Sequence, residues 1–268
     1  MRLSAVTVWY NPDESCVKNI LTYSFGVEKC YIIDNSDSDN SELSSKITNA
    51  VYLPNMANLG IAKALNIGCE KALTDGFEWC MTMDQDSSWE SEQLQIYLGA
   101  VEKKVSQKAV SFAPAVSKHD FGKSEIPVNK VITSGNVINL GVWNEVGRFY
   151  EPFFIDEVDN EFCYRVREHD YEILQIQSVH MNHHLGDERK HVLPLLCHSG
   201  VRLYYMVRNA LFIKNMHPQF YKTEHYTQWL RYFSFRIVIE GMLRLKFKNI
   251  VYLLRAKHDF AMNKLGKY

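Results

Sequence analysis

The sequence predicts an α/β fold in which a mainly parallel sheet is flanked by helices. Short apolar runs alternate with helical patterns through the first half of the chain, as expected for strands joined by crossover helices. At 268 residues and 46% hydrophobic content, the chain is long enough for one such domain and a smaller appendage. Polar residues follow several apolar runs, where sheets of this kind bind ligands beyond the carboxyl ends of their strands.

The runs that we interpret as strands are short and stop at polar or turn-forming residues. In chain order they cover residues 3–10, 29–36, 50–54, 77–84, 109–116, 130–140 and 171–186. The run at 130–140 contains a break at Ser134, Gly135 and Asn136. Together these runs predict one sheet whose strand ends carry Asp34 and Asp84.

Helical patterns separate the strands. The clearest covers residues 58–76, where apolar side chains recur at a spacing of four and Gly76 closes the helix. Further helices are expected at residues 13–24 and 91–105, and another after the acidic segment at 153–162.

The composition changes near residue 200, which is the one candidate boundary in the chain. Residues 1–200 form the predicted α/β domain, and residues 201–268 form a helical C-terminal region. From Arg231 to the end there are nine Lys and Arg against two Asp and Glu, interleaved with apolar and aromatic residues. This segment is either a helical cap with solvated charges or a peripheral contact with an anionic membrane surface.

Charge, cysteine usage and hydropathy exclude several classes of protein. The formal charge of -1 gives no overall attraction to nucleic acid. The six cysteines contain no C-x-x-C pair, so we expect reduced thiols in a cytoplasmic compartment and no structural zinc. The N-terminus does not resemble a signal peptide, and no segment reaches the roughly 18 apolar residues of a membrane span. A cytoplasmic protein is expected, either free or peripheral on the inner face of the plasma membrane.

Asp84 and Asp86 follow the predicted strand at 77–84 and are two residues apart. Two such carboxylates can point into one crevice and offer hard oxygen ligands to Mg²⁺ or Mn²⁺, whose remaining positions go to water and phosphate. The simpler interpretation is a polar turn after a buried strand, because short motifs have many false positives.

A second acidic cluster lies in "FFIDEVDNEF". Asp156 followed by Asp159 resembles a helix N-cap with an acid at the third helical position. Glu161 and Arg165 have the spacing of an ion pair on a helix surface. Capping explains the two aspartates, yet a carboxylate at a helix N-terminus can also accept a proton from a substrate hydroxyl. Asp159 is the best candidate for that role.

Two further elements carry weaker signals. In "HMNHHLG", one of His183 and His184 could complete a metal site with Asp84 and Asp86. In "RLYYMVRN", Arg202 and Arg208 are separated by aromatic residues. They are either snorkelling arginines of an amphipathic helix, or one of them meets a phosphate.

Taken in order, eight segments resemble the family-2 glycosyltransferases of GT-A (Rossmann-like) fold, and within them the bacterial rhamnosyltransferase group. The segments are "VWYNP", "IIDNS", "NLGIAKALNIG", "MDQDSS", "ITSGNVI", "FFIDEVDNEFCYR", "HHLG" and "RLYYMVRN". The resemblance runs from residue 3 to about residue 215, and it departs from the group at Trp9, where Thr is more usual.

The resemblance implies an inverting transfer from a nucleotide-activated sugar, with dTDP-L-rhamnose as the expected donor. The implied acceptor is a hydroxyl of a bacterial surface polysaccharide or of its lipid-linked precursor. Another sugar on UDP or dTDP would fit the same residues. The implied cofactor is Mn²⁺ or Mg²⁺.

The resemblance also implies a role for each matching residue. Asp159 takes the position of the catalytic base. The metal-binding positions are Asp84, Asp86 and His183, which lies three residues before Gly186. The positions that contact or border the nucleotide are Asn11, Asp34, Asn35, Asn58, Gly60, Asn66, Asp84 and Arg208.

Two other classes of function are alternatives to a transferase. A non-catalytic subunit that binds a nucleotide sugar or a glycan would keep the same fold, although the intact acidic set argues against it. A nicotinamide-dependent oxidoreductase would need a G-x-G-x-x-G turn after its first strand. The sequence there is "YNPDES", so the pyrophosphate-binding turn is missing.

Overall fold

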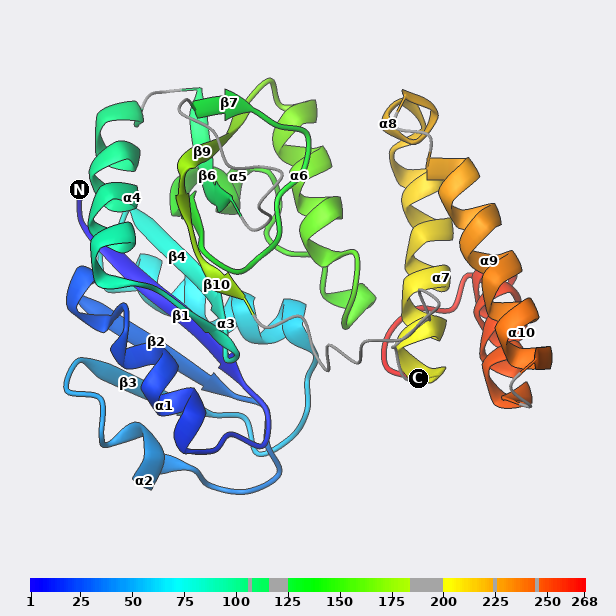
Figure 1. Ribbon diagram of the computed structural model, residues 1–268, viewed down its shortest axis with the longest axis horizontal. Helices are drawn as coiled ribbons and strands as arrows, with labels where there is room; N and C mark the ends of the chain where they lie inside the picture. The colour runs from blue at the N-terminus through cyan, green and yellow to red at the C-terminus, as the bar shows by residue number, and fades with distance from the viewer. Residues whose placement is uncertain (106–107, 116–124, 184–199, 224–225, 244–245) are drawn as a thin grey trace.

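The computed structural model describes residues 1–105, 108–115, 125–183, 200–223, 226–243 and 246–268 (Figure 1). An eight-stranded sheet runs in the order β3-β2-β1-β4-β8-β6-β9-β7, and β10 and β5 form a separate two-stranded sheet. Helices cover the sheet, and a group of C-terminal helices lies beside it (Figure 1). The predicted fold class is confirmed.

The strands of the described residues are short. Their bounds are β1 Leu3–Trp9, β2 Lys29–Asp34, β3 Ala50–Pro54, β4 Trp79–Asp84, β5 Ser87–Ser88, β6 Ala109–Ala115, β7 Glu125–Pro127, β8 Asn136–Asn139, β9 Glu172–His180 and β10 Asn182–His183. β1 pairs in parallel with β2 and β4, β2 with β3, and β6 with β9. β8 is antiparallel to both of its neighbours, and β7 is antiparallel to β9. The sheet is therefore mainly parallel with an antiparallel insertion.

The helices follow the predicted alternation with strands. Their bounds are α1 Glu14–Leu21, α2 Ser41–Ser44, α3 Ile61–Thr74, α4 Ser91–Lys104, α5 Leu140–Glu145, α6 Val158–Glu168, α7 Gly200–Met216, α8 Pro218–Thr223, α9 Tyr226–Leu243 and α10 Phe247–Ala261. Two 3-10 turns, η1 Ser24–Gly26 and η2 Glu151–Phe153, complete the set for the described residues. Gly76 follows α3 with a φ of +84°, the left-handed conformation that commonly ends a helix.

Alternating residues of β1 divide the core into two layers. Leu3, Ala5 and Trp9 pack on the face that α1 and α4 cover, whereas Val6 and Val8 pack on the face that α3 covers. Successive side chains of a strand point to opposite faces. Both faces of the central strand are therefore buried, as a doubly covered sheet requires.

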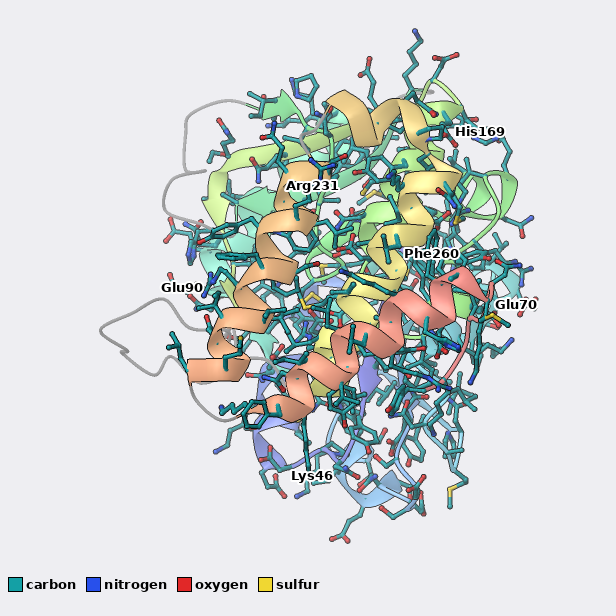
Figure 2. All side chains as sticks on the ribbon, turned by 90° about the vertical axis from the view of Figure 1, so that its right-hand side faces the viewer. Lys46, Glu70, Glu90, His169, Arg231 and Phe260 are labelled. Atoms are coloured by element: carbon teal, nitrogen blue, oxygen red, sulfur yellow. The ribbon has the colours of Figure 1, made fainter. Side chains whose placement is uncertain are left out.

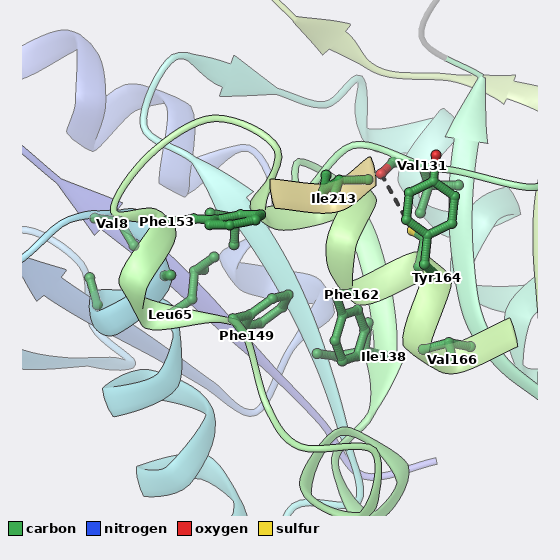
Figure 3. Close-up of a cluster of buried hydrophobic side chains, with 14 of the residues drawn as sticks. Val8, Leu65, Val131, Ile138, Phe149, Phe153, Phe162, Tyr164, Val166 and Ile213 are labelled. Carbon is green, nitrogen blue, oxygen red and sulfur yellow. Dashed lines mark hydrogen bonds between the residues drawn. The ribbon is translucent and has the colours of Figure 1, made fainter. Parts of the chain in front are cut away.

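The core layer over α3 continues into the C-terminal helices. Phe149, Phe153 and Phe162 lie close together in this layer, and Ile213 of α7 joins it (Figure 3). Buried residues of α9 and α10 belong to the same cluster. The division of the chain at residue 200 stays a prediction.

Two predicted elements differ in extent. The strand expected at 130–140 is limited to β8, because Gly135 with a φ of +76° turns the chain just before it. The helix expected at 13–24 is α1 followed by η1. Asp13 caps α1 by accepting a hydrogen bond from the Ser15 N–H at 2.8 Å.

The tail after α10 returns to the rest of the molecule. The Gly266 N–H donates to the Pro152 carbonyl at 2.9 Å, and the Tyr268 N–H donates to the Tyr205 hydroxyl at 2.7 Å. The chain therefore ends beside α7 (Figure 1). Among the helices that the structure describes, none is long and apolar enough to cross a bilayer.

Candidate active site at the carboxyl edge of the sheet

The predicted site residues of the first three pairing strands lie at one edge of the sheet. In the strand register Trp9 lies opposite Asp34, and Val8 lies opposite Asp84. Because β1, β2 and β4 are parallel, their carboxyl ends meet there, as the sequence predicts.

Asp84 lies half-buried at the end of β4. Its backbone N–H donates to the Ser134 hydroxyl at 3.1 Å, and that hydroxyl donates to the Ser87 hydroxyl at 2.8 Å. Burial raises the pKa of Asp84, and the negative charges of Asp86 and Asp159 add to this effect, so that the pKa is raised to about 7. Residues far apart in the sequence thus act on one carboxyl group.

Asp159 brings α6 into the same site. It occupies the second position of the helix, and its Oδ1 accepts a hydrogen bond from the Asn160 N–H at 2.8 Å. Burial raises the pKa of Asp159, the charge of Asp156 adds to this, and the Lys130 ammonium opposes it. A carboxylate with a raised pKa is a stronger base than an ordinary one, which suits proton transfer from a hydroxyl.

Asp156 does not cap α6, which corrects the sequence interpretation. The helix begins at Val158, and the N-cap position is Glu157, whose side chain makes no capping bond. Asp156 instead accepts a hydrogen bond from Arg202 Nε of α7 at 3.0 Å. Arg202 is also the cation that lowers the pKa of Asp84. The pair therefore joins the acidic edge to the C-terminal helices.

The segment before α6 has an unusual backbone. Phe154, Asp156 and Glu157 all have positive φ values, of 68°, 60° and 64°. The Asn209 side-chain amide holds this segment by donating to the carbonyls of Phe153, Ile155 and Asp156, at 3.1, 2.8 and 2.9 Å. Strained backbone of this kind persists where the surroundings fix it, and it is common at functional sites.

Arg208 has a different position from the one that the resemblance implies. Its side chain is fully buried, and it donates to the carbonyls of Gly266 at 2.7 Å and Phe153 at 3.2 Å. Its Nε donates to Asn209 Oδ1 at 3.0 Å. The structure therefore places Arg208 in the packing between α7, the tail and the segment before α6. Of the two arginines, Arg202 is the one that acts on Asp84.

The buried pair Glu161 and Arg165 is a second correction. The predicted ion pair forms at 2.6 Å, but the Glu161 side chain is fully buried rather than on the helix surface. His217 after α7 lies 3.5 Å from the Glu161 carboxylate and contributes to lowering its pKa. Because Arg165 and His217 both lie against the fully buried Glu161 carboxylate, the pair is part of the core.

Asp34 organises the loop after β2. Its Oδ1 accepts hydrogen bonds from the Ser36 N–H at 2.9 Å and hydroxyl at 2.5 Å. Its Oδ2 accepts from Asn40 Nδ2 and from the Tyr52 hydroxyl, each at 2.8 Å. Asn11, with a φ of 48°, donates its N–H to the same Ser36 hydroxyl at 2.8 Å. Polar groups from β1, β2 and β3 thus form one connected network.

The network continues to the start of α3. Asn35 Nδ2 donates to the Gly60 carbonyl at 3.1 Å, and Asn58 Oδ1 accepts from the Gly60 N–H at 3.0 Å. Gly60 has a φ of +85°, and a Cβ there would lie 2.6 Å from the Phe154 carbonyl oxygen. The Ile61 N–H donates to that same oxygen at 2.7 Å. Only glycine allows this close approach of the two loops.

Asn66 lies apart from this network. It is buried in α3, its Nδ2 donates to the Phe149 carbonyl at 2.9 Å, and its Oδ1 accepts from the Phe149 N–H at 3.0 Å. The structure therefore brings together most of the predicted nucleotide-binding positions through hydrogen bonds, and it gives Asn66 a packing role. The connected positions are Asn11, Asp34, Asn35, Asn58 and Gly60.

The possible metal site has two described carboxylates. The backbone of His183 pairs with Ser87, the residue after Asp86, in the small two-stranded sheet. The side chain of His183 lies outside the described part of the structure, and so do His184 and Gly186. Among the residues that the structure describes, no group of three or more His, Cys, Asp or Glu is arranged to hold a metal. Asp84 and Asp86 nevertheless fit Mg²⁺ or Mn²⁺, which commonly use one or two carboxylates together with phosphate oxygens.

Sequence reasoning missed two residues of this edge. The sequence pattern predicts a helix cap at Asp156, and it contains no signal for Lys267. The Lys267 ammonium donates to the Asn58 carbonyl at 3.3 Å and lies 5.8 Å from the centre of the Phe154 ring. Only the return of the tail brings it there, and no local pattern reports such a contact.

Comparison with known proteins identifies the family of this chain. The chain belongs to glycosyl transferase family 2, whose sequence model matches residues 14–150, and it is a glycosyltransferase. It is 28% identical over 235 residues to dTDP-rhamnosyl transferase RfbF of Shigella flexneri, with 78% of each chain covered.

Solved structures share the fold at low sequence identity. TarS of S. aureus, residues 1–349 in complex with UDP-GlcNAc, gives a TM-score of 0.63 at 15% identity over 97% of this chain and 80% of that one. GalNAc-T7 with UDP, GalNAc and Mn²⁺ gives a TM-score of 0.56 at 12% identity, over 90% of this chain and 57% of that one. These similarities show the GT-A fold.

Proposed function

We propose that this glycosyltransferase moves L-rhamnose from dTDP-L-rhamnose, with inversion, to a hydroxyl of a bacterial surface polysaccharide or its lipid-linked precursor. The similarity to a dTDP-rhamnosyl transferase supports this choice of donor. We also propose that it acts in the cytoplasm, at the inner face of the plasma membrane.

The observation that carries the proposal is the electrostatic interaction among three carboxyl groups. Asp84 and Asp86 come from the end of β4, and Asp159 comes from the start of α6. The charges of Asp86 and Asp159 both raise the pKa of Asp84. Negative charges that raise one another's pKa are unfavourable together without a compensating cation. A site of this kind suits a substrate that brings both a diphosphate and a divalent cation.

We assign proton transfer to Asp159. The acceptor hydroxyl oxygen attacks the anomeric carbon of the sugar, and its proton passes to the Asp159 carboxylate. The bond from the anomeric carbon to the diphosphate breaks, and its electron pair leaves on the diphosphate oxygen. A single displacement inverts the anomeric centre and needs only one catalytic carboxylate, unlike hydrolysis, where a second acid protonates the leaving oxygen.

We assign the departing diphosphate to Asp84, Asp86, His183 and Arg202. The first three would hold Mn²⁺ or Mg²⁺, and a bound cation would neutralise charge that develops on the phosphate oxygens. Arg202 replaces Arg208 in this role, because its guanidinium lies beside Asp156 and acts on Asp84. A half-exposed arginine can turn toward a phosphate, for which its planar fork is well suited.

We assign the nucleotide to the hydrogen-bonded network between β1, β2 and the start of α3. Asp34 lies at the end of β2 with Asn35 and Ser36 beside it, and the Asn58–Gly60 turn forms the neighbouring wall. Backbone at Gly60 approaches the segment before α6 closely, so a ligand in this place would contact both loops.

A transfer assay tests the proposal. The full chain is incubated with dTDP-rhamnose, UDP-GlcNAc or UDP-glucose and a glycan acceptor, in Mn²⁺, in Mg²⁺ and in EDTA. We expect transfer from dTDP-rhamnose with metal, and a loss of about a thousandfold in Asp159→Asn, because general base catalysis contributes on this scale.

The control for that variant is donor binding, which Asp159→Asn should retain. Full activity in Asp159→Asn would reject it as the base. Binding of a nucleotide sugar without transfer in the wild type would favour a non-catalytic binding subunit.

A further inference from the structure

Helix α9 has two apolar faces. Leu230, Phe233 and Ile237 are buried against the neighbouring helices. On the opposite side, Tyr232 and Phe235 are 61% and 62% exposed, and the exposed row continues along the helix. Its further members are Ile239, Met242 and Leu243. A helix with apolar residues all round normally has a partner on each face.

Helix α10 repeats this arrangement beside α9. Leu253 and Ala256 are buried, whereas Phe247, Val251 and Leu254 form an exposed row at spacings of four and three. Figure 2 shows α9 and α10 as the layer nearest the viewer, in front of α7. In Figure 1 the same two helices lie on the side of α7 away from the sheet. We call these two exposed rows the outer apolar face.

A basic pocket lies between the helices that carry this face. It has a volume of about 320 Å³ and an apolar floor of Val207, Leu211 and Leu230. Its charged lining is cationic, with Lys214 of α7, Arg231 of α9 and Lys257 of α10. No acidic residue is among its described lining residues. Three cations around an apolar floor match a phosphate group attached to an apolar chain.

The described acidic residues of α9 and α10 pair with arginines of their own helices. Glu240 is paired with Arg236 at 2.8 Å, and Asp259 is buried and paired with Arg255 at 3.0 Å. Exposed Lys246 and Lys248 border the outer apolar face at the start of α10. The face is therefore apolar at its centre and cationic at its margins.

We propose that the outer apolar face and the basic pocket form a docking surface for an anionic phospholipid bilayer. The apolar rows enter the boundary between headgroups and acyl chains, and the pocket receives a lipid phosphate. A second copy of the chain would bring the cationic margins of both chains into one contact, which is unfavourable. Charge complementarity therefore selects the bilayer. This surface lies outside the acidic edge and does not depend on the donor sugar.

One tryptophan provides an internal probe. Of the five tryptophans in the sequence, Trp229 of α9 is 37% exposed, and the others are buried in the sheet domain. The buried ones are Trp9, Trp79, Trp89 and Trp143. Lipids brominated near the headgroup should therefore quench Trp229 selectively when the face enters the bilayer.

The experiment measures binding of the full chain to vesicles of phosphatidylcholine alone and of phosphatidylcholine mixed with phosphatidylglycerol. We expect binding to the mixed vesicles only, weakened by salt, with quenching by brominated lipid. The variant Phe235→Ser with Leu254→Ser should bind on the order of tenfold more weakly, because two large side chains no longer leave water. Arg231→Glu with Lys257→Glu should lose a similar factor and most of the salt dependence.

Matched controls separate the surface from general effects. Phe25→Ser removes a 56% exposed phenylalanine from η1, and Lys103→Glu reverses an exposed charge on α4. Both should bind like the wild type. Negligible binding of the wild type to both vesicles would overturn the proposal. So would a wild-type dimer that Phe235→Ser dissociates in solution without any vesicle binding, since a second copy would then cover the face.

Discussion

The carboxyl edge of the sheet and the outer layer of helices have opposite chemical characters. At the edge, the negative charges of Asp86 and Asp159 act on Asp84, and polar side chains are connected to one another by hydrogen bonds. The outer layer is apolar and cationic. The formal charge of -1 for the whole chain hides both. Local placement of charge, rather than net charge, indicates which ligands each region can take.

Helix α7 belongs to both regions, and replacing each of its two arginines should affect stability and activity differently. Replacing Arg208 with Ala should lower the free energy of unfolding by about 3 kcal/mol, because buried carbonyls lose a charged hydrogen-bond donor. Replacing Arg202 with Ala should change it by less than about 1 kcal/mol, because its pair with Asp156 is partly exposed. Unfolding in urea measures both.

For transfer activity we expect the reverse order, with the larger loss on replacing Arg202 and the smaller on replacing Arg208. Arg202→Ala should lose at least about tenfold in kcat/KM, since a charge-assisted contact to the leaving group contributes on this scale. Correctly folded Arg208→Ala, measured at low temperature, should keep most of its activity. An Arg202→Ala variant with wild-type kcat/KM would break the proposed division of roles.

The pKa of Asp84 gives a smaller, pH-dependent effect. Because its pKa is raised to about 7 from 3.8, the folded protein holds a proton that the unfolded chain releases. The associated stability is present below the ordinary pKa and is lost as the pH rises through about 7. In EDTA, Asp84→Asn should therefore gain stability relative to the wild type on going from about pH 5 to about pH 8.

Thermal unfolding of both proteins at the two pH values measures this difference. Adding Mn²⁺ at the higher pH should raise the unfolding temperature of the wild type more than that of Asp84→Asn. A difference between the two proteins that does not vary with pH would mean that Asp84 is ionised throughout.

The parts of the site that were predictable have local signals. Asp34 and Asp84 follow apolar runs directly, and a carboxylate just past a buried strand in an alternating pattern lies at the ligand-binding edge. The helix at 58–76 was equally predictable, because its apolar spacing and its terminating Gly76 lie within one segment. These features need only neighbours in the sequence.

The parts that were missed depend on contacts between distant segments. Arg208 looks like a phosphate ligand until the tail and the Phe153 carbonyl surround it. Asp156 looks like a cap until Arg202 meets it. On α9 the exposed and buried apolar rows are alike in sequence, so only the packed helices distinguish the outer face from the core.

The central claim is that Asp84, Asp86 and Asp159 form one site for a metal and a nucleotide sugar. Isothermal titration of dTDP-rhamnose into the wild type and Asp86→Ala, with and without Mn²⁺, tests it most directly. We expect Mn²⁺ to tighten binding to the wild type by at least about tenfold, a gain of about 1.4 kcal/mol, and to have little effect on Asp86→Ala. Equal binding in all four titrations would contradict the claim.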